Sequence, residues 1–413
     1  MIEREPLERA DQIVVIIGAG LAGLRVAEGL RGAGFPGRVV LVGDEPHEPY
    51  DRPPLSKAVL EIEGHEHAIA LAPGDMLAAL TLELRLGEPA VSIDRGQRAV
   101  TLRSGERLGY DRLVLATGSR LRTLALLPPS APGVHYLRTL DDAVALRAAL
   151  TTGRRVAIIG GGVIGLEVAA TARGLGCGVT VIEAADRPMA RTTSPPISSF
   201  FTNRHRREGV DIRLGVTVAA AEKTADGVQL QLSSGETVQA ETVVVGVGVV
   251  TNVELAAAAG LDLRDGGVLV DGFGTTSDRR IYAAGEVATH FNARDGGHDR
   301  QDTWNHAAAH GEHVGRSMIA AGEPYAETPS YWSDQYDINL QIVGATLGEI
   351  DVVRGDPDDG RFLVFHLKDG RIAGVSAVNA VRDLRAARRL IGRRAKPDEL
   401  ADANADLTAI ALD

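Results

Sequence analysis

The sequence has almost no cysteine: among 413 residues, Cys177 stands alone. No disulfide can form within one chain, and no pair of thiols is present to accept electrons. Long apolar runs are also missing, because residues 13–19 and 243–250 fall well short of the roughly 20 residues that cross a bilayer. Residues 1–6 are charged and lack the apolar core of a signal peptide. We therefore expect a cytoplasmic protein that uses no membrane.

Positive charge is scarce as well. Lysine and arginine number 44 against 55 acidic residues, which gives a net charge of −11 and disfavours a nucleic-acid or anionic-membrane partner. At about 150 residues per domain, the length predicts two or three domains. Glycine is abundant, with 48 residues in a chain of ordinary hydrophobic content. We expect these glycines at special backbone positions rather than in a disordered linker.

Two segments of the chain share one pattern. Residues 13–17 and 156–159 are buried-strand runs, and each leads into a glycine turn, a helix-compatible stretch and a second β-branched run. A hairpin-like stretch and a further strand follow each copy. The turns read Gly18-Ala19-Gly20-Leu21-Ala22-Gly23 and Gly160-Gly161-Gly162-Val163-Ile164-Gly165. The repeat predicts a duplicated dinucleotide-binding α/β fold.

A glycine turn of this kind binds a pyrophosphate at the N-terminus of its helix. Asp44 and Glu45 follow the second strand of the first copy, and Glu183 follows that of the second. At this place a carboxylate accepts hydrogen bonds from ribose hydroxyls and repels a 2′-phosphate. Glu183 therefore favours NADH over NADPH, although the nearby Arg187 and Arg191 soften the preference. The alternative is that Glu183 is a solvated acid at a strand end.

The last part of the chain reads differently. Short strands are expected at residues 338–343, 350–354, 362–367 and 372–378, and Asp369-Gly370 is a tight-turn signal between the last two. A helix with a basic face is expected at residues 382–394. This pattern predicts an antiparallel sheet capped by a helix.

Three segments resemble a known family: YDRPPLSK at 50–57, GGGVIGLEVA at 160–169 and YWSDQ at 331–335. They are similar to the FAD-dependent ferredoxin reductases of bacterial oxygenase systems, which serve aromatic-ring dioxygenases in aromatic hydrocarbon catabolism and putidaredoxin-type ferredoxins. The resemblance covers essentially the whole chain. It implies a glutathione-reductase-like α/β fold with two Rossmann-like dinucleotide-binding domains and a C-terminal α+β domain. The expected divisions are an FAD domain at 1–118 and 247–325, an NAD domain at 119–246, and a C-terminal domain at 326–413.

The resemblance also implies cofactor positions. Those for FAD are Gly18, Gly20, Leu21, Ala22, Gly23, Asp44, Glu45, Arg52, Val91, Ala116, Thr117, Gly118, Arg138, Glu286, Val287 and Trp304. Those for NAD are Gly160, Gly162, Val163, Ile164, Gly165, Glu183, Arg191, Gly246 and Trp332. It places Lys57 beside the reactive face of the flavin, paired with Glu167. Glu286 stands where the family usually has aspartate, so the carboxylate is kept but its reach is one methylene longer.

Several of these residues have a plainer interpretation. Lys57 by charge alone is a surface lysine at a helix start, Glu167 an acid near the start of a helix, and the two tryptophans core residues. The histidines at 306, 310 and 313 would share one helix face, as a metal site requires. They lie at an alanine-rich helix start with no cysteine nearby, so we expect packing or surface histidines and no metal. A helix beginning after Trp304 is expected to point its N-terminus at the flavin.

The lone cysteine decides where electrons go. FAD takes a hydride as a pair of electrons and releases electrons singly, and one thiol cannot accept them, so an external carrier is needed. The resemblance implies a [2Fe–2S] ferredoxin, which a basic face including Arg388, Arg389, Arg393 and Arg394 would attract. A solvated helix face is the alternative for these arginines.

These observations together predict an NADH-dependent ferredoxin reductase that uses NADPH less well. The nearest alternative is a rubredoxin reductase or a nitrite-reductase-type electron donor of the same fold. A more distant one is a non-catalytic NADH-sensing flavoprotein. The sequence names neither the ferredoxin nor the terminal oxygenase.

Overall fold

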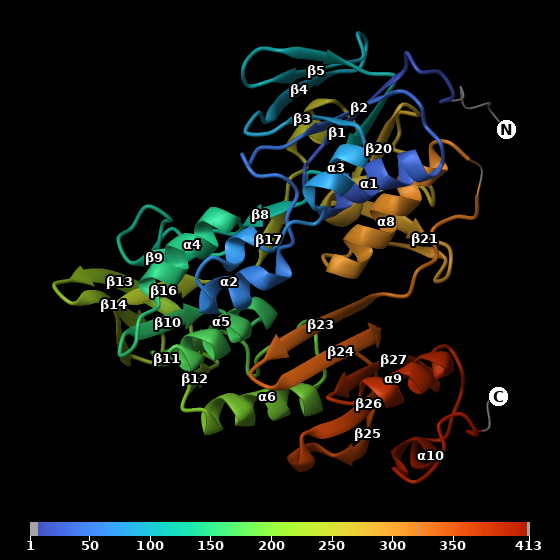
Figure 1. Ribbon diagram of the computed structural model, residues 1–413. Coiled ribbons are helices and arrows are strands. Elements are labelled where there is room, and N and C mark those ends of the chain that lie inside the picture. The colour runs from blue at the N-terminus through green and yellow to red at the C-terminus, as the bar shows by residue number, and fades with distance from the viewer. Residues whose placement is uncertain (1–6, 321, 411–413) are drawn as a thin grey trace. The chain divides into compact units, whose positions relative to one another are not determined.

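The computed structural model describes residues 7–320 and 322–410, in two compact units (Figure 1). The first unit comprises Met1–Asp51, His67–Arg120 and Val249–Pro329, and the second Arg52–Glu66, Leu121–Gly248 and Ser330–Asp413. Residues 1–6, on which part of the case against a signal peptide rests, lie outside the described residues. No helix in the described part of the chain combines the length and apolar character needed to span a membrane. The three-domain division stays a prediction.

The first unit is built on a five-stranded parallel sheet. Its strands, in spatial order, are β20 (Ile281–Ala283), β7 (Arg112–Leu115), β1 (Ile13–Ile17), β2 (Arg38–Val42) and β3 (Leu82–Arg85). Side chains of β1 alternate between two cores. Val14 and Ile16 pack in one core with side chains of helices α1 (Leu21–Gly32) and α8 (Trp304–Ser317), and Val15 and Ile17 pack in the other. The sheet is therefore covered on both faces, which explains the continuous apolar runs of its strands.

Helices α1 and α8 approach each other to backbone contact. A Cβ on Gly315 of α8 would lie 2.2 Å from the carbonyl oxygen of Val26 in α1. A Cβ on Gly311 would lie 2.5 Å from that of Ala22. Because helix separation depends on the side chains at the contact, these glycines bring α8 against the helix that follows the first glycine turn.

Smaller elements complete the first unit. One antiparallel sheet contains β4 (Ala90–Asp94), β5 (Ala99–Leu102) and β6 (Arg107–Gly109). A mixed sheet contains β18 (Leu263–Arg264), β19 (Gly267–Val270), β21 (Ala288–Asn292) and β22 (Gly297–Asp299). The remaining helices are α3 (Gly74–Ala79) and α7 (Glu254–Ala258). Strands β8 (Ser119–Leu121) and β17 (Val249–Thr251) pair with each other.

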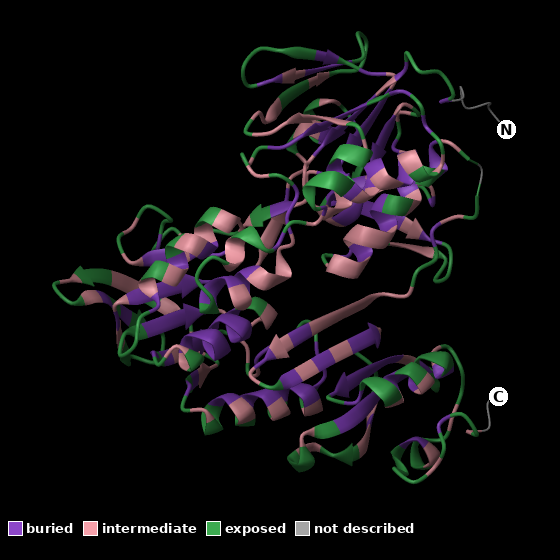
Figure 2. Ribbon diagram, viewed as in Figure 1, coloured by how far each residue is buried: buried purple, intermediate pink, exposed green. Residues whose placement is uncertain are grey.

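The second unit repeats the parallel sheet. Its strands, in order, are β12 (Asp211–Leu214), β11 (Gly178–Glu183), β10 (Arg155–Ile159), β16 (Thr242–Val245) and β9 (Val134–Tyr136). The β1-α1-β2 order recurs as β10, α5 (Val163–Gly174) and β11, as the sequence repeat predicts. Figure 2 shows these strands as largely buried. Associated elements are α2 (Ala58–Glu61), α4 (Leu140–Ala149), α6 (Pro195–Arg207), β13 (Val218–Thr224), β14 (Gly227–Leu232) and β15 (Thr237–Ala240).

The C-terminal segment forms the expected antiparallel sheet. Its strands, in order, are β23 (Ser330–Gln335), β24 (Ile338–Gly344), β27 (Arg371–Val378), β26 (Arg361–Lys368) and β25 (Ile350–Asp356). Asp369 and Gly370 have φ of 51° and 68°, as a two-residue hairpin turn of type I′ requires. The predicted tight turn is therefore confirmed.

The helix expected at residues 382–394 is wrong in its length. Helix α9 (Val381–Ala387) is followed by a 3₁₀ turn at Arg388–Leu390, and α10 (Pro397–Ala401) comes later. Gly392 has φ of 88°, which a helix cannot accommodate. Its N–H donates to the Ile372 carbonyl, and the Ile372 N–H donates to Arg393, so this stretch runs beside β27.

Candidate functional sites

Of the three glycines that define the first turn, only one has open space where a Cβ atom would lie. Gly18 has φ of 116°, and a Cβ on it would lie 2.1 Å from the carbonyl oxygen of Ala116. A Cβ on Gly23 would lie 1.9 Å from that of Gly18. Gly20, the N-cap of α1, has no described atom within 4 Å of its Cβ position. The outer glycines thus permit the tight packing, and Gly20 keeps the helix N-terminus accessible.

The second turn has the same geometry. A Cβ on Gly160 would lie 2.3 Å from the Gly246 carbonyl oxygen, and one on Gly165 would lie 2.1 Å from that of Gly160. Gly162, the N-cap of α5, again meets no described atom within 4 Å. Val163 and Ile164 begin this helix, as Leu21 and Ala22 begin α1.

Both turns fit a dinucleotide pyrophosphate. The first N–H groups of each helix have no partner within the helix and carry the positive end of its dipole. The first turns of α1 and α5 contain no acid that would repel an anion. An open N-cap glycine lets the ligand approach the backbone closely.

Other predicted FAD positions lie at the same sheet edge as the first turn. Thr117, which follows β7, donates through Oγ1 to the Asn252 carbonyl at 2.7 Å, and Asn252 Nδ2 donates back to the Thr117 carbonyl at 2.9 Å. Glu286 and Val287 follow β20, a neighbour of β7. Carboxyl ends of parallel strands meet at one edge, where ligands bind in such sheets. Asn252 carried no signal in the sequence.

The backbone just before Glu286 also touches the first glycine turn. Gly285 has φ of 71°, and a Cβ on it would lie 2.6 Å from Cβ of Ala22. Its N–H donates to Nδ1 of the buried His310 at 3.2 Å. The backbone before Glu286 is therefore fixed against both α1 and α8.

The remaining FAD candidates lie in several places. Tyr50 donates to Glu45 at 2.5 Å, and Asp44 is exposed beside it. Trp304, the first residue of α8 rather than the residue before it, donates through Nε1 to Asp51 at 2.6 Å.

Three further candidates are Ala116 and Gly118 after β7, and Val91 in β4, where its side chain is 52% exposed. In the second unit, Arg52 donates to the carbonyl of Arg138 at 2.5 Å. FAD contact at these positions stays a prediction.

Glu183 is fixed beside the second turn. Its Oε2 accepts from the N–H of Gly161 at 2.6 Å, and Oε1 accepts from that of Ala185 at 2.7 Å. Arg187 donates to two carbonyls of its own loop, those of Ala190 and Thr193. Its guanidinium is thus engaged. Arg191 Nη2 lies 3.5 Å from the Cβ position of Gly248, two residues after Gly246.

Lys57 and Glu167 form the pair that the resemblance implies. Lys57 Nζ donates to Glu167 Oε2 at 2.8 Å, and the side chain of Glu167 is only 2% exposed. Ser56 Oγ donates to the same oxygen at 2.5 Å, and Ser333 Oγ donates to Oε1 at 2.7 Å. Glu167 is therefore a buried acceptor rather than a solvated acid. Both serines lie inside motifs noted in the sequence, yet neither was singled out there. Trp332, the other motif residue, is half-buried beside Ser333 in β23.

The histidines of α8 are packing residues. His306 and His310 are buried: the His306 ring stacks on that of His290 with the centroids 4.6 Å apart, and the His310 ring is tilted against it at 5.0 Å. Among the described residues, no three potential ligands are placed to hold a metal ion. Burial lowers the pKa of His306 to about 3 and that of His290 to about 4, so both rings are neutral.

Cys177 is buried. Its Sγ donates to the carbonyl of Thr151 at 3.4 Å. Burial raises the pKa of the thiol, which makes the reactive thiolate scarce.

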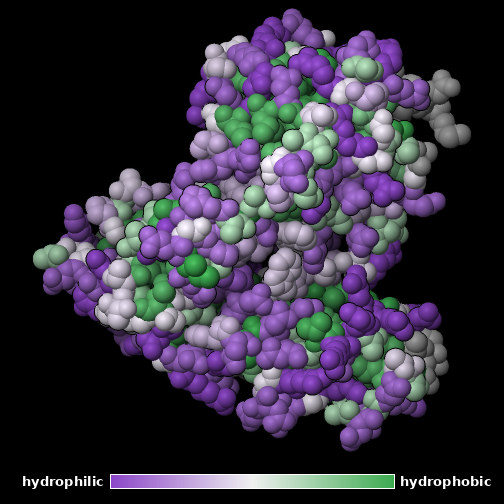
Figure 3. All heavy atoms as spheres, viewed as in Figure 1, coloured by the Kyte–Doolittle hydropathy of each residue, from purple (hydrophilic) through white to green (hydrophobic). Residues whose placement is uncertain are grey.

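The basic residues near the C-terminus form one exposed segment, which we call the basic segment: Arg382, Arg385, Arg388, Arg389, Arg393, Arg394 and Lys396. Within the described residues, none of its arginines forms an ion pair, whereas Lys396 pairs with Glu399. Figure 3 shows strongly hydrophilic side chains over α9. These positive charges are available to an anionic partner.

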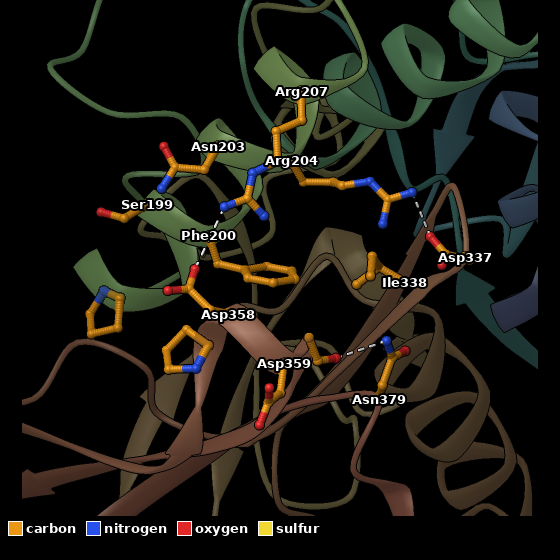
Figure 4. A pocket seen from close by; sticks show the side chains of 13 residues that line it. Ser199, Phe200, Asn203, Arg204, Arg207, Asp337, Ile338, Asp358, Asp359 and Asn379 are labelled. Carbon is orange, nitrogen blue, oxygen red and sulfur yellow. Dashed lines mark hydrogen bonds and ion pairs between the residues drawn. The ribbon is translucent and has the colours of Figure 1, made fainter.

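A cavity of about 420 Å³ lies in the second unit, and no residue of a glycine turn lines it. It is lined by α6 and by turns of the C-terminal sheet (Figure 4). Two ion pairs line it, Arg204 with Asp337 at 2.7 Å and Arg207 with Asp358 at 3.6 Å.

Comparison with known families gives two matches. The family described as pyridine nucleotide-disulphide oxidoreductase matches residues 12–311, and the one described as reductase C-terminal matches residues 330–411. Among curated proteins, the chain is 46% identical over 393 residues to the anthranilate 1,2-dioxygenase system ferredoxin–NAD(+) reductase component of Burkholderia cepacia, covering 94% of this chain and 96% of that protein.

Comparison with solved structures also finds ferredoxin reductases. The ferredoxin reductase for the CYP199A2 system from Rhodopseudomonas palustris matches with a TM-score of 0.93 and 41% identity, over 97% of this chain and 100% of that one. The reductase in the covalent putidaredoxin reductase–putidaredoxin complex matches with a TM-score of 0.92 and 37% identity, over 97% and 98% of the two chains.

Proposed function

Because this chain belongs to the pyridine nucleotide-disulphide oxidoreductase family and carries its reductase C-terminal domain, we propose that it is an NADH-dependent ferredoxin reductase that holds FAD. The family resemblance and the fold class predicted from the sequence are both confirmed. One observation carries the proposal: two glycine turns with matching geometry, each open only at the N-cap of its helix.

The two turns take different dinucleotides. The first, with Thr117 and the carboxylate of Glu286 at the same sheet edge, holds FAD, and the second, with Glu183 beside it, holds NADH. FAD, when bound, supplies a centre that takes two electrons as a hydride and gives them up singly. The remaining tasks belong to the chain, which must bind both dinucleotides and set the charge around the reacting atoms.

Lys57 supplies positive charge for the hydride step. Reduction of a flavin adds negative charge, and a fixed cation stabilises it most where water is excluded. Glu167 restrains the ammonium group, since Lys57 and Ser56 both donate to one oxygen of its carboxylate. The pair therefore presents an oriented charge rather than a mobile surface lysine.

Glu183 selects NADH. Its two oxygens are held by backbone N–H groups beside the second turn, so the negative charge stays where a 2′-phosphate would lie. Since Arg187 is occupied by its own loop, Arg191 is the arginine that we expect to offset this charge.

The electron acceptor is a separate [2Fe–2S] ferredoxin. The only cysteine of the chain is buried, so it offers no thiol pair for the electrons. The basic segment attracts an acidic protein despite the overall charge of −11. The solved complex of a relative with putidaredoxin supports an acceptor of this kind.

A charge reversal tests the docking role of the basic segment. Arg393→Glu together with Arg394→Glu is expected to raise the KM for ferredoxin at least about tenfold at low salt, and less as salt screens the charges. Flavin reduction by NADH is expected to be unchanged. The control is Arg98→Glu with Arg103→Glu, which makes the same charge change at exposed positions of the first unit. An equal rise of KM in the control contradicts docking on the basic segment.

A panel of acceptors tests the function as a whole. The NADH-reduced protein is mixed with a Rieske-type [2Fe–2S] ferredoxin, a cysteine-ligated [2Fe–2S] ferredoxin and a rubredoxin. Rapid oxidation by one of the ferredoxins is the expected result. Oxidation by rubredoxin alone supports the rubredoxin reductase alternative, and reduction without transfer to any acceptor supports the NADH sensor.

A further inference from the structure

A row of buried side chains leads away from the Glu167 carboxylate. Ser333 Oγ donates to Glu167 Oε1 at 2.7 Å, and Gln335 Nε2 donates to Ser333 Oγ at 3.1 Å. His205 Nε2 lies 2.8 Å from Gln335 Oε1, and Tyr336 Oη lies 2.9 Å from His205 Nδ1. All five residues belong to the second unit, and the three middle ones are at most 1% exposed.

The hydrogen bonds in this row run in one direction. Because the Gln335 carbonyl can only accept, Nε2 of His205 carries the proton, and Nδ1 accepts from the Tyr336 hydroxyl. Ser333 accepts from the Gln335 amide and donates to Glu167. Every donor therefore points toward the carboxylate, an arrangement in which successive bonds strengthen one another. Burial lowers the pKa of His205 to about 4, which keeps the ring neutral.

Tyr336, at the outer end of the row, has a strained backbone and packs against a cation. Tyr336 has φ of 57°, in the left-handed region that a bulky side chain rarely adopts. It lies in the turn between β23 and β24. The Arg204 guanidinium lies 5.1 Å from the Tyr336 ring centroid and pairs with Asp337 (Figure 4). These contacts keep the hydroxyl aimed at His205.

Glu167 depends on this row for one of its oxygens. Oε2 receives both Ser56 and Lys57, whereas Oε1 receives only Ser333 among the described side chains. If the Ser333 hydroxyl turns away, the buried carboxylate loses a donor and its orientation toward Lys57 is no longer fixed. A buried acceptor left without its donor is costly, so the site would rearrange.

We propose that His205, Gln335 and Tyr336 are positioning residues that act through Ser333 to hold the Glu167 carboxylate in its pairing with Lys57 during hydride transfer. The inference rests on the proposed function. It gives the C-terminal sheet and α6 a part in the reaction, although neither carries a glycine turn. The proposed role needs no contact of these residues with either dinucleotide, because they act only through Glu167.

Variants at the middle and the end of the row test the inference. Tyr336→Phe removes one donor, and His205→Phe removes both bonds of the ring. Each is expected to lower the rate of flavin reduction by NADH about five- to tenfold, with the dissociation constant for NADH unchanged. His205→Gln is expected to restore most of the rate, because its amide presents a donor to Gln335 and an acceptor to Tyr336.

A control variant separates positioning from general damage to α6. Thr202→Val removes a buried hydroxyl of the same helix, which bonds only the carbonyl of Ser198 within the described chain. Its rate of flavin reduction is expected to equal that of the parent protein. An equal loss in Thr202→Val, or no recovery in His205→Gln, overturns the inference.

A double-mutant cycle tests whether the row acts through Glu167. In a Glu167→Gln background, Tyr336→Phe is expected to cause no further loss of rate. The same fold-loss in both backgrounds overturns the inference while leaving the proposed function intact. Failure of NADH to reduce the flavin of the parent protein overturns both.

Discussion

At the scale of single residues, the structure joins Lys57 to Glu167 across 110 positions of sequence. A carboxylate that is 2% exposed needs donors, and here it has an ammonium group and two hydroxyls. Removing one member of a buried ion pair leaves the other charge uncompensated. Substitutions at this pair therefore report on charge placement more than on local packing.

Lys57→Ala is expected to slow hydride transfer by at least about tenfold, because a fixed charge near the reacting atoms is lost. The dissociation constant for NADH is expected to change less than twofold. Stopped-flow traces of flavin reduction at several NADH concentrations give both quantities. Weaker NADH binding with an unchanged limiting rate would contradict a role of Lys57 in the hydride step.

Glu183→Ala is expected to narrow the preference for NADH over NADPH by about tenfold, since the charge that repels a 2′-phosphate is removed. The ratio of kcat/KM for the two nucleotides measures the preference. Asp186→Ala is the control, because it removes the same charge from an exposed position three residues later. An unchanged ratio in Glu183→Ala would refute the assignment.

The residue patterns visible in the sequence were those repeated at fixed spacing. Gly18 and Gly160 could be predicted because strand, turn and helix are consecutive in the chain. Ser333 and His205 could not, because a buried serine or histidine has no local signature. Their roles arise only when β23 and α6 come together in the folded second unit.

At the scale of elements, the contact between α1 and α8 depends on small residues. Gly315→Ala is expected to lower the free energy of unfolding by about 1–3 kcal/mol, because its Cβ would lie 2.2 Å from the Val26 carbonyl oxygen. Denaturant titration of the FAD-bound protein measures the change. Gly32→Ala at the end of α1 is the control, since no described atom lies within 4 Å of its Cβ position. Equal effects of the two substitutions would show that helix propensity, and not the close contact, sets the change in the free energy of unfolding.

The end of the helix expected at residues 382–394 could not be predicted from the sequence. Basic residues at 382–394 have a helical spacing, but Gly392 adopts a positive φ and the chain turns to bond β27. Two-residue turns such as Asp369-Gly370 were easier to predict, because their residue types match the required backbone angles.

At the scale of the whole molecule, the buried histidines make stability depend on pH. The pKa is lowered by burial to about 4 for His205 and His290 and to about 3 for His306. In the unfolded chain each would titrate near about 6.5. As pH falls below that value, the unfolded chain takes up protons that the folded rings refuse, so stability is lost until the folded pKa is reached.

The free energy of unfolding is therefore expected to fall between about pH 6.5 and pH 4, by up to about 1.4 kcal/mol per pH unit for each of these histidines. Urea titrations across this range measure it. His306→Phe is expected to make the dependence shallower, whereas His65→Gln, at a half-buried position outside this buried group, is expected to leave it unchanged. A slope that His306→Phe leaves untouched would contradict this origin.

The overall charge of −11 disfavours nucleic acids and anionic surfaces as partners. The exposed basic segment is the surface to which we propose that one acidic partner is attracted. The composition alone was enough to predict the effect of the overall charge. The basic segment was visible in the sequence as a run of charge, but the fold was needed to show that its side chains are exposed and that, within the described residues, its arginines form no ion pair.

Double-mixing stopped flow follows the proposed transfer of electrons from NADH through FAD to a ferredoxin, one step at a time. The FAD-loaded protein is first reduced anaerobically with one equivalent of NADH and then mixed with an oxidised [2Fe–2S] ferredoxin, while flavin and iron–sulfur absorbance are followed. Rapid bleaching of the flavin is expected in the first step, and in the second step the flavin absorbance is expected to return as two equivalents of ferredoxin are reduced. Bleaching by NADH without any reduction of ferredoxin would contradict the proposed transfer.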